Sequence, residues 1–175
     1  MRLRSAWLLI VNVVWTVLLL GAAAVDPSPV IDAAKNGDIA TLRALIEQNA
    51  DVNAATEDGV TALHWATYRD DLESVLLLIR AGAAVNATTD LGVTPLWNAS
   101  FNGGEAIADA LLEAGANPNG ALLLGETPLM AAARSGSAHI VRELARRGAD
   151  VNAKATRGRT IQIGPSSIFS PYFAL

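Results

Sequence analysis

The tetrapeptide Thr94-Pro95-Leu96-Trp97 is the stretch that best predicts the fold, because it recurs along the chain with a constant step. Thr61-Ala62-Leu63-His64 precedes it by 33 residues, and Thr127-Pro128-Leu129-Met130 follows it by 33 residues. A further threonine, Thr160, keeps the same step. Self-similarity with a period of this length is typical of repeat proteins, in which each unit packs on its neighbours.

A second series of segments keeps the same 33-residue step and ends each time in an asparagine. Its members are Asn49–Asn53, Gly82–Asn86, Gly115–Asn119 and Gly148–Asn152. Apolar residues such as Val75, Leu78 and Ile79 lie between the two series at helical spacing. Each unit is therefore predicted to contain a helix, a tight turn, a second helix and a loop.

Residues that favour helix ends stand where these helices would begin and stop. Thr94 and Thr127 are predicted to cap the first helices, with a proline next in each case, and Ser28-Pro29 is predicted to start the first unit in the same way. Asp70 and Glu73 have the spacing of a capping box for a second helix. The residues expected in left-handed conformation after the helices are Gly37, Gly103, Gly136, Gly82, Gly115, Gly148 and Asn49.

These motifs resemble the ankyrin-repeat family over about Ser28 to Thr160. The resemblance implies an all-α solenoid of stacked helix-turn-helix units with projecting hairpin loops. The predicted repeat domain covers residues 25–160, with about four repeats at 28–60, 61–93, 94–126 and 127–159. Family members typically bind other proteins on their concave face, so the resemblance implies a non-catalytic interaction module.

The two ends of the repeat array depart from the pattern. The first unit lacks the tetrapeptide and opens on Asp32–Asp38, a polar segment typical of a capping repeat. After Thr160 the chain continues as an irregular tail, residues 161–175, in which Pro165 and Pro171 oppose a continuous helix. Either this tail folds back on the fourth unit, or the chain is a truncated or frame-shifted piece of a longer array. The sequence slightly favours truncation.

The N-terminal segment has the three parts of a signal peptide. Arg2 and Arg4 precede an apolar run from Ala6 to Leu20, and the small residues Ala22 and Ala24 follow it. We expect residues 1–24 to be a signal peptide that is removed after Ala24. The alternative is an uncleaved membrane anchor, since the run is just long enough to span a bilayer. Both interpretations place the repeats outside the cytoplasm, in the periplasm or secreted.

The composition leaves little material for catalysis. Apolar residues make up 51% of the 175 residues and charged residues 17%, which excludes a disordered chain or a basic nucleic-acid arm. The chain has no cysteine and two histidines, and it lacks a glycine-rich phosphate loop, so no cofactor, metal or enzymatic activity is expected. The resemblance implies that His64 hydrogen-bonds locally and holds adjacent repeats together. His139 is expected to be exposed, and Ser137 is too close to it in sequence to form a catalytic dyad.

The family's usual contact surface consists of the loop tips and the outer edge of each first helix. Carried over to this chain, the loop tips offer Glu57, Asp58, Val60, Asp90, Leu91, Val93, Leu123, Leu124 and Glu126, and the helices offer Tyr68, Arg69, Phe101, Asn102, Arg134 and Ser135. Tyr68 and Phe101 lie one repeat apart, and the sequence leaves open whether they dock a partner or pack on their own loops. Leu122–Leu124 would form an apolar docking patch with Phe101.

Charge is unevenly distributed along the chain, whose net charge is −4. Residues 25–126 contain 4 basic and 15 acidic side chains, whereas residues 127–175 contain 7 basic and 2 acidic ones. Opposite signs at the two ends of a linear stack predict weak head-to-tail self-association at low salt. The expected partner is a protein and not a nucleic acid, and membrane contact is expected only through the N-terminal segment if it is not cleaved.

Overall fold

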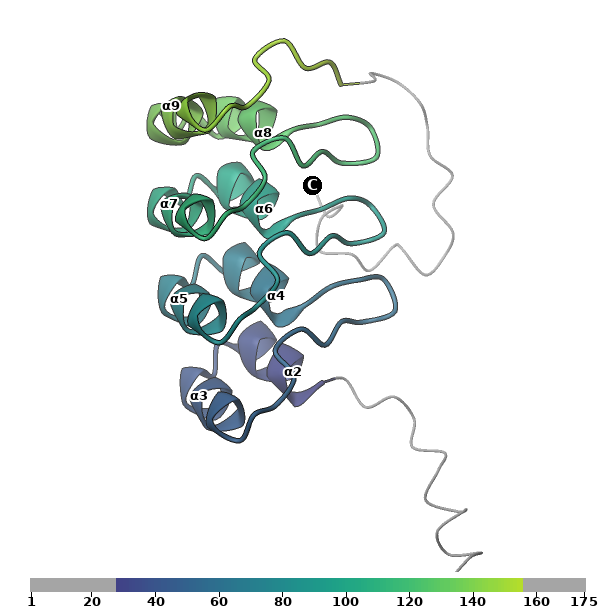
Figure 1. Ribbon diagram of the computed structural model, residues 1–175, viewed down its shortest axis with the longest axis vertical. Coiled ribbons are helices and arrows are strands. Elements are labelled where there is room, and N and C mark those ends of the chain that lie inside the picture. Colours follow the sequence, from purple (N-terminus) through teal and green to yellow (C-terminus); the bar gives the residue numbers. More distant parts are fainter. Residues whose placement is uncertain (1–27, 156–175) are drawn as a thin grey trace, which may run out of the picture.

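The computed structural model describes residues 28–155 and arranges them as helix pairs stacked in one row (Figure 1). The pairs are α2 (Pro29–Asn36) with α3 (Ile39–Glu47), α4 (Ala62–Tyr68) with α5 (Leu72–Arg80), α6 (Pro95–Asn102) with α7 (Glu105–Glu113), and α8 (Pro128–Ser135) with α9 (Ala138–Arg146). The predicted all-α repeat solenoid is therefore confirmed. The predicted signal peptide or anchor (1–24) and the irregular tail (161–175) lie outside the described residues.

The four pairs form two parallel rows of helices and a row of loops. In Figure 1, the first helices α2, α4, α6 and α8 lie next to the projecting loops, and the second helices α3, α5, α7 and α9 form the opposite side. Ala66, Ala99 and Ala132 are fully buried on the first helices, where a small side chain lets neighbouring helices approach. Leu78, Leu111 and Leu144 are fully buried on the second helices. These two repeating positions build one continuous hydrophobic core along the stack.

Threonine caps begin two of the first helices, as predicted. Thr94 Oγ1 accepts a hydrogen bond from the backbone N–H of Trp97 at 3.1 Å, and Thr127 Oγ1 accepts one from Met130 at 3.3 Å. Ser28 precedes Pro29 in the first unit, but its side chain makes no capping hydrogen bond, so that part of the prediction is wrong.

The predicted capping box of Asp70 and Glu73 is also wrong. Asp71 caps α5 instead, since its Oδ1 accepts from the backbone N–H of Ser74 at 3.2 Å and its Oδ2 accepts from the Ser74 hydroxyl at 2.6 Å. Asp70 adopts a left-handed conformation with φ 56°, at the position where the other repeats have glycine. Aspartate tolerates this conformation better than most residues, so Asp70 ends the preceding helix and Asp71 starts the next.

Asparagine side chains join each loop to the next repeat. Asn53 donates from Nδ2 to the carbonyl of Gly82 at 3.1 Å and accepts at Oδ1 from the N–H of Ala84 at 2.7 Å. The same pair of bonds recurs one repeat later at Asn86, and again at Asn119. The carbonyl acceptors belong to Gly82, Gly115 and Gly148, all in the predicted left-handed conformation. The sequence pattern indicated a turn here but not this ladder between repeats.

Candidate protein-binding surface

His64 links α4 to the loop that leads into the third repeat, from a fully buried position. Its Nδ1 accepts a hydrogen bond from the backbone N–H of Thr61 at 3.2 Å, which leaves Nε2 to donate to the carbonyl of Val93 at 3.0 Å. One bond is local and the other reaches the next loop, so the structural role implied by the resemblance is confirmed. His64 is therefore a packing residue and not a surface for a ligand.

Neutral His64 makes stability depend on pH. Burial lowers the pKa of His64, although the carbonyl of Val93 and the negative charge of Asp58 act in the opposite direction. Histidine in the unfolded chain has a pKa of about 6.5. As the pH falls, the unfolded chain therefore binds a proton more readily than the folded protein does. The contribution of His64 to the free energy of unfolding is fully present above the pKa of the unfolded chain's histidine and is lost as the pH falls below it.

We expect wild type to lose up to about 1.4 kcal/mol more stability than His64→Gln between pH 7.5 and pH 5.5. Titrating carboxylates contribute equally to both proteins, so the difference isolates His64. Urea denaturation at the two pH values measures it. Equal losses in the two proteins would contradict a buried neutral histidine at this position.

The projecting loops are held to one another in a stack. The N–H of Asp90 donates to the carbonyl of Asp58 at 3.0 Å, and the N–H of Leu123 donates to the carbonyl of Leu91 at 3.0 Å. The loops approach so closely that a Cβ on Gly92, which has φ 79°, would lie 2.8 Å from the carbonyl oxygen of Ala121. Because the loops are ordered before any partner arrives, binding would lose little conformational entropy.

The predicted loop-tip residues divide into three groups by exposure. Glu57, Asp58, Asp90 and Leu123 are exposed, whereas Leu91, Leu124 and Glu126 are half-buried. Val60 and Val93 are only 8% and 3% exposed, so the prediction that their side chains contact a partner is wrong. Each precedes a capping threonine, and the chain turns inward there to begin the first helix.

Tyr68 and Phe101 pack on neighbouring tryptophans and still remain exposed. The Tyr68 ring meets the edge of Trp65 with centroids 5.9 Å apart, and the Phe101 ring stacks on Trp97 at 5.1 Å. Both side chains keep more than a third of their area exposed. Packing and docking, which the sequence left as alternatives, are therefore compatible at both positions, because the packed face and the exposed face differ.

The polar residues predicted on the first helices make contacts with neighbouring repeats. Arg69 donates to the carbonyl of Lys35 at 3.3 Å, Asn102 donates to the carbonyl of Tyr68 at 2.9 Å, and Ser135 donates to that of Ser100 at 2.9 Å. Arg134 lies 5.1 Å from the centre of the Phe101 ring and pairs with Glu126 at 2.6 Å. These four side chains thus help to fix the surface on which they lie.

The three consecutive leucines do not act as one patch. Leu122 is half-buried and packs, with Leu91, against a small cluster of Val93, Trp97 and Ala131. Leu123 is 65% exposed and Leu124 is half-buried. Leu122 begins a tight turn that the N–H of Gly125 closes by donating to the Leu122 carbonyl at 2.7 Å, so the three side chains leave the backbone in different directions. The exposed apolar surface is therefore smaller than the sequence predicted.

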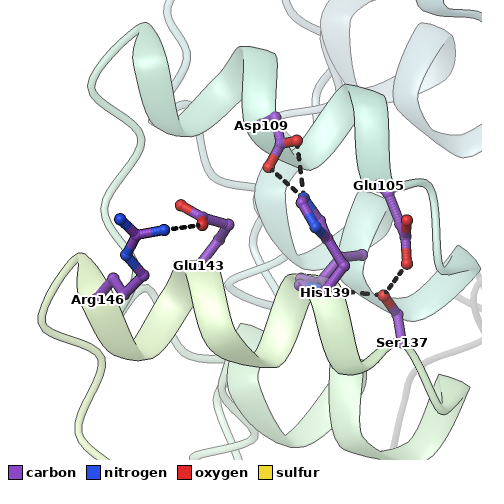
Figure 2. Close-up of polar contacts among 7 residues, drawn as sticks. Glu105, Asp109, Ser137, His139, Glu143 and Arg146 are labelled. Atoms are coloured by element: carbon purple, nitrogen blue, oxygen red, sulfur yellow. Dashed lines mark hydrogen bonds and ion pairs between the residues drawn. The ribbon is translucent and has the colours of Figure 1, made fainter.

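The second histidine, His139, lies on α9, in the row of second helices away from the projecting loops (Figure 1), and Figure 2 shows its contacts. His139 on α9 is partly exposed, at 35% of its side-chain area, and its Nε2 bonds both carboxylate oxygens of Asp109 on α7, at 2.8 and 3.0 Å, so the expected exposure is only partly confirmed. The Ser137 hydroxyl donates to Glu105 on α7 at 2.8 Å. Ser137 and His139 thus reach different carboxylates of the preceding repeat, and this arrangement holds repeats together rather than activating a nucleophile.

The stacked helix pairs and ordered loops define a repeat solenoid that presents a preformed surface. A family model described as ankyrin repeats (3 copies) matches residues 12–89, 30–121 and 69–155. The chain belongs to the ankyrin-repeat family, whose members are generally protein-interaction modules. A search of curated proteins found no match. Among the helices of residues 28–155, none is long and apolar enough to cross a membrane.

Proposed function

We propose that this protein is a non-catalytic module that binds a partner protein through its loop tips and the exposed edges of α4, α6 and α8. The observation that carries the proposal is the row of exposed aromatic rings. Tyr68 and Phe101 are held rigidly by Trp65 and Trp97, and rigid aromatic side chains at a surface are typical of binding hot spots. The ion pair between exposed Arg134 and half-buried Glu126 fixes the rim beside Phe101.

Leu123→Asp combined with Phe101→Ala is expected to weaken capture of the partner on the order of tenfold or more, while the protein stays folded, because both side chains are exposed. The two changes remove exposed apolar surface and add a charge to the loop tip. Capture of proteins from extracts of the source cells, compared band by band with wild type, measures the effect. Leu72→Asp on α5 is the matched control, since Leu72 is exposed to the same degree as Phe101 but lies in the other row of helices. Unchanged capture by the double variant would contradict the proposal.

We also propose that the module works outside the cytoplasm, which the three-part pattern of residues 1–24 supports. The expected result is a mature chain that begins at Val25, measured as the intact mass of the protein in the exported fraction. If residues 1–24 are retained in the membrane fraction, the alternative holds, and the repeats act as a membrane-anchored scaffold. Recovery of the full-length chain in the cytoplasm would contradict both.

Weak self-association is proposed as a second property, because the fourth repeat exposes an apolar side chain whose equivalent in the first repeat is buried. Val151 is 69% exposed, whereas the equivalent Val52 is 8% exposed under the next repeat. The excess of basic residues after Thr127 favours contact with the acidic end of another copy. Sedimentation at 20 mM salt is expected to depend on protein concentration, and this dependence should disappear at 500 mM salt.

A further inference from the structure

The loop tips change in chemistry along the stack, and this order suggests which partner they recognise. Glu57 and Asp58 lie at the first tip, Asp90 and Leu91 occupy the same positions at the second, and Leu123 and Leu124 occupy them at the third. The row therefore runs from acidic to apolar. We name these six residues the tip row.

The acidic side chains of the tip row are free to meet a partner's charge. In the part of the chain that the structure describes, none of Glu57, Asp58 and Asp90 forms an ion pair. Asp58 accepts a hydrogen bond from the hydroxyl of Thr56, which orients its carboxylate without neutralising it. All three residues are exposed. A partner with basic side chains can therefore gain ion pairs here without breaking existing ones.

The basic side chains of the first helices are engaged within the molecule. Lys35 lies over the Trp65 ring at 5.2 Å, Arg69 donates to a backbone carbonyl, and Arg134 pairs with Glu126. The loop segments 54–60 and 87–93 themselves contain three acidic residues and no basic one, so the field that a partner meets at the first two tips is negative. Charge complementarity of this kind favours a basic partner and disfavours an acidic one.

Apolar contacts continue inward from the third tip. Leu91 and Leu122 pack against Trp97, and Trp97 stacks on Phe101. Leu123, the most exposed of the tip leucines, adds an apolar side chain at the outer end of this series. A partner side chain beside Leu123 would therefore bury apolar surface, whereas one beside Glu57 or Asp90 would meet a carboxylate.

The spacing of the tips sets the spacing of the partner's side chains. Packed helices lie about 8–10 Å apart, and a polyproline II segment rises about 3.1 Å per residue with three residues per turn, so every third side chain faces the same side at about this spacing. We infer that the tip row recognises a polypeptide segment in polyproline II conformation with two basic side chains and one large apolar side chain at intervals of three residues. This inference rests on the proposed function and adds the chemistry of the partner to it.

Three synthetic 13-residue peptides with serine spacers test the inference with the full chain by fluorescence anisotropy. The first carries Lys, Lys and Leu three residues apart, the second replaces both lysines by Glu, and the third places Lys, Lys and Leu two residues apart. We expect the first peptide to bind at least tenfold more tightly than the second and at least threefold more tightly than the third. Its affinity should also fall as salt rises.

Two matched double variants test whether the first peptide binds at the tip row. Glu57→Gln combined with Asp90→Asn should weaken binding of the first peptide three- to tenfold, as expected for the loss of two exposed ion pairs. Glu47→Gln with Glu113→Gln removes two exposed carboxylates from the other row of helices and should change the affinity less than twofold.

Equal binding of the Lys and Glu peptides, or equal effects of the two double variants, would overturn the charge assignment. Equal binding of the two spacings would overturn the register. If any of these results appears while Leu123→Asp with Phe101→Ala still weakens capture of a cellular partner, the proposed function stands and only its partner chemistry is wrong. If neither peptide binding nor capture responds to the variants, both are overturned.

Discussion

His64→Ala is expected to lower the free energy of unfolding by about 3 kcal/mol. The ring is fully buried between α4 and the loop that precedes α6, so its removal leaves a cavity that the packed helices cannot fill. The carbonyl of Val93 also loses the donor at 3.0 Å, and the N–H of Thr61 loses its acceptor. A buried polar group without a partner adds its desolvation cost to the cost of the cavity.

Chemical denaturation followed by circular dichroism measures this loss, and His139→Ala provides the control. His139 also bonds the neighbouring repeat, through Asp109, but both side chains are more than a third exposed. Its removal is therefore expected to cost no more than about 1 kcal/mol. If the two alanine variants lose equal stability, then burial does not make the hydrogen bonds of His64 more stabilising than the exposed bonds of His139.

The helix ends could be predicted from the sequence because local chemistry determines them. Thr94 caps α6 through a hydrogen bond to a residue three positions away, so the sequence contains all the information that is needed. The same reasoning was wrong at Asp70, where two adjacent aspartates offer two possible caps. The left-handed backbone of Asp70 and the packing of the preceding helix select Asp71, and neither factor can be inferred from residue type alone.

The ladder of asparagines could not be predicted, since it depends on contacts between repeats. Asn53 bonds a carbonyl 29 residues away, and the pattern Asp51-Val52-Asn53 indicates only a turn. Recurrence of the asparagine at Asn86 and Asn119 is the signal that could have found it. A polar residue kept in register in four successive loops has a partner that recurs with the same period.

The exposure of side chains at the candidate surface also depends on contacts that the sequence does not show. Val93 and Leu123 were predicted as loop-tip residues on equal grounds, but Val93 packs against Trp97, whereas Leu123 points away from it. Trp97 replaces the histidine of the preceding repeat, and its larger ring creates the small cluster around it. The repeat register thus predicts where the loops project, whereas the exposure of individual loop residues depends on the side chains packed inside the stack.

One buried amide at the junction between the second and third repeats has no equivalent at the junction between the third and fourth repeats. At the earlier junction, Asn98 donates from Nδ2 to the carbonyl of His64 and to the hydroxyl of Thr67, both at 3.3 Å. Ala131 occupies the position of Asn98 one repeat later, and Ser100 occupies that of Thr67. Among the described residues, Ser100 Oγ and Trp97 Nε1 are buried without a hydrogen-bond partner.

Ala131→Asn is expected to raise the free energy of unfolding by about 1 kcal/mol, because the new amide can donate to Ser100 Oγ and to the carbonyl of Trp97. The reverse change at the earlier junction, Asn98→Ala, should lower the free energy of unfolding by about 2–3 kcal/mol, since it removes both bonds and opens a cavity.

Ala131→Leu separates hydrogen bonding from filled volume, because leucine has nearly the shape of asparagine but no donor. We expect it to leave stability unchanged or lower it, whereas Ala131→Asn raises it, in urea denaturation at pH 7.5. Equal shifts from the two variants would show that packing at this position, and not the unpartnered hydroxyl of Ser100, limits the stability of the fourth repeat. A gain confined to asparagine would instead mean that a buried amide, like that of Asn98, stabilises a repeat junction, and that the last described junction lacks one.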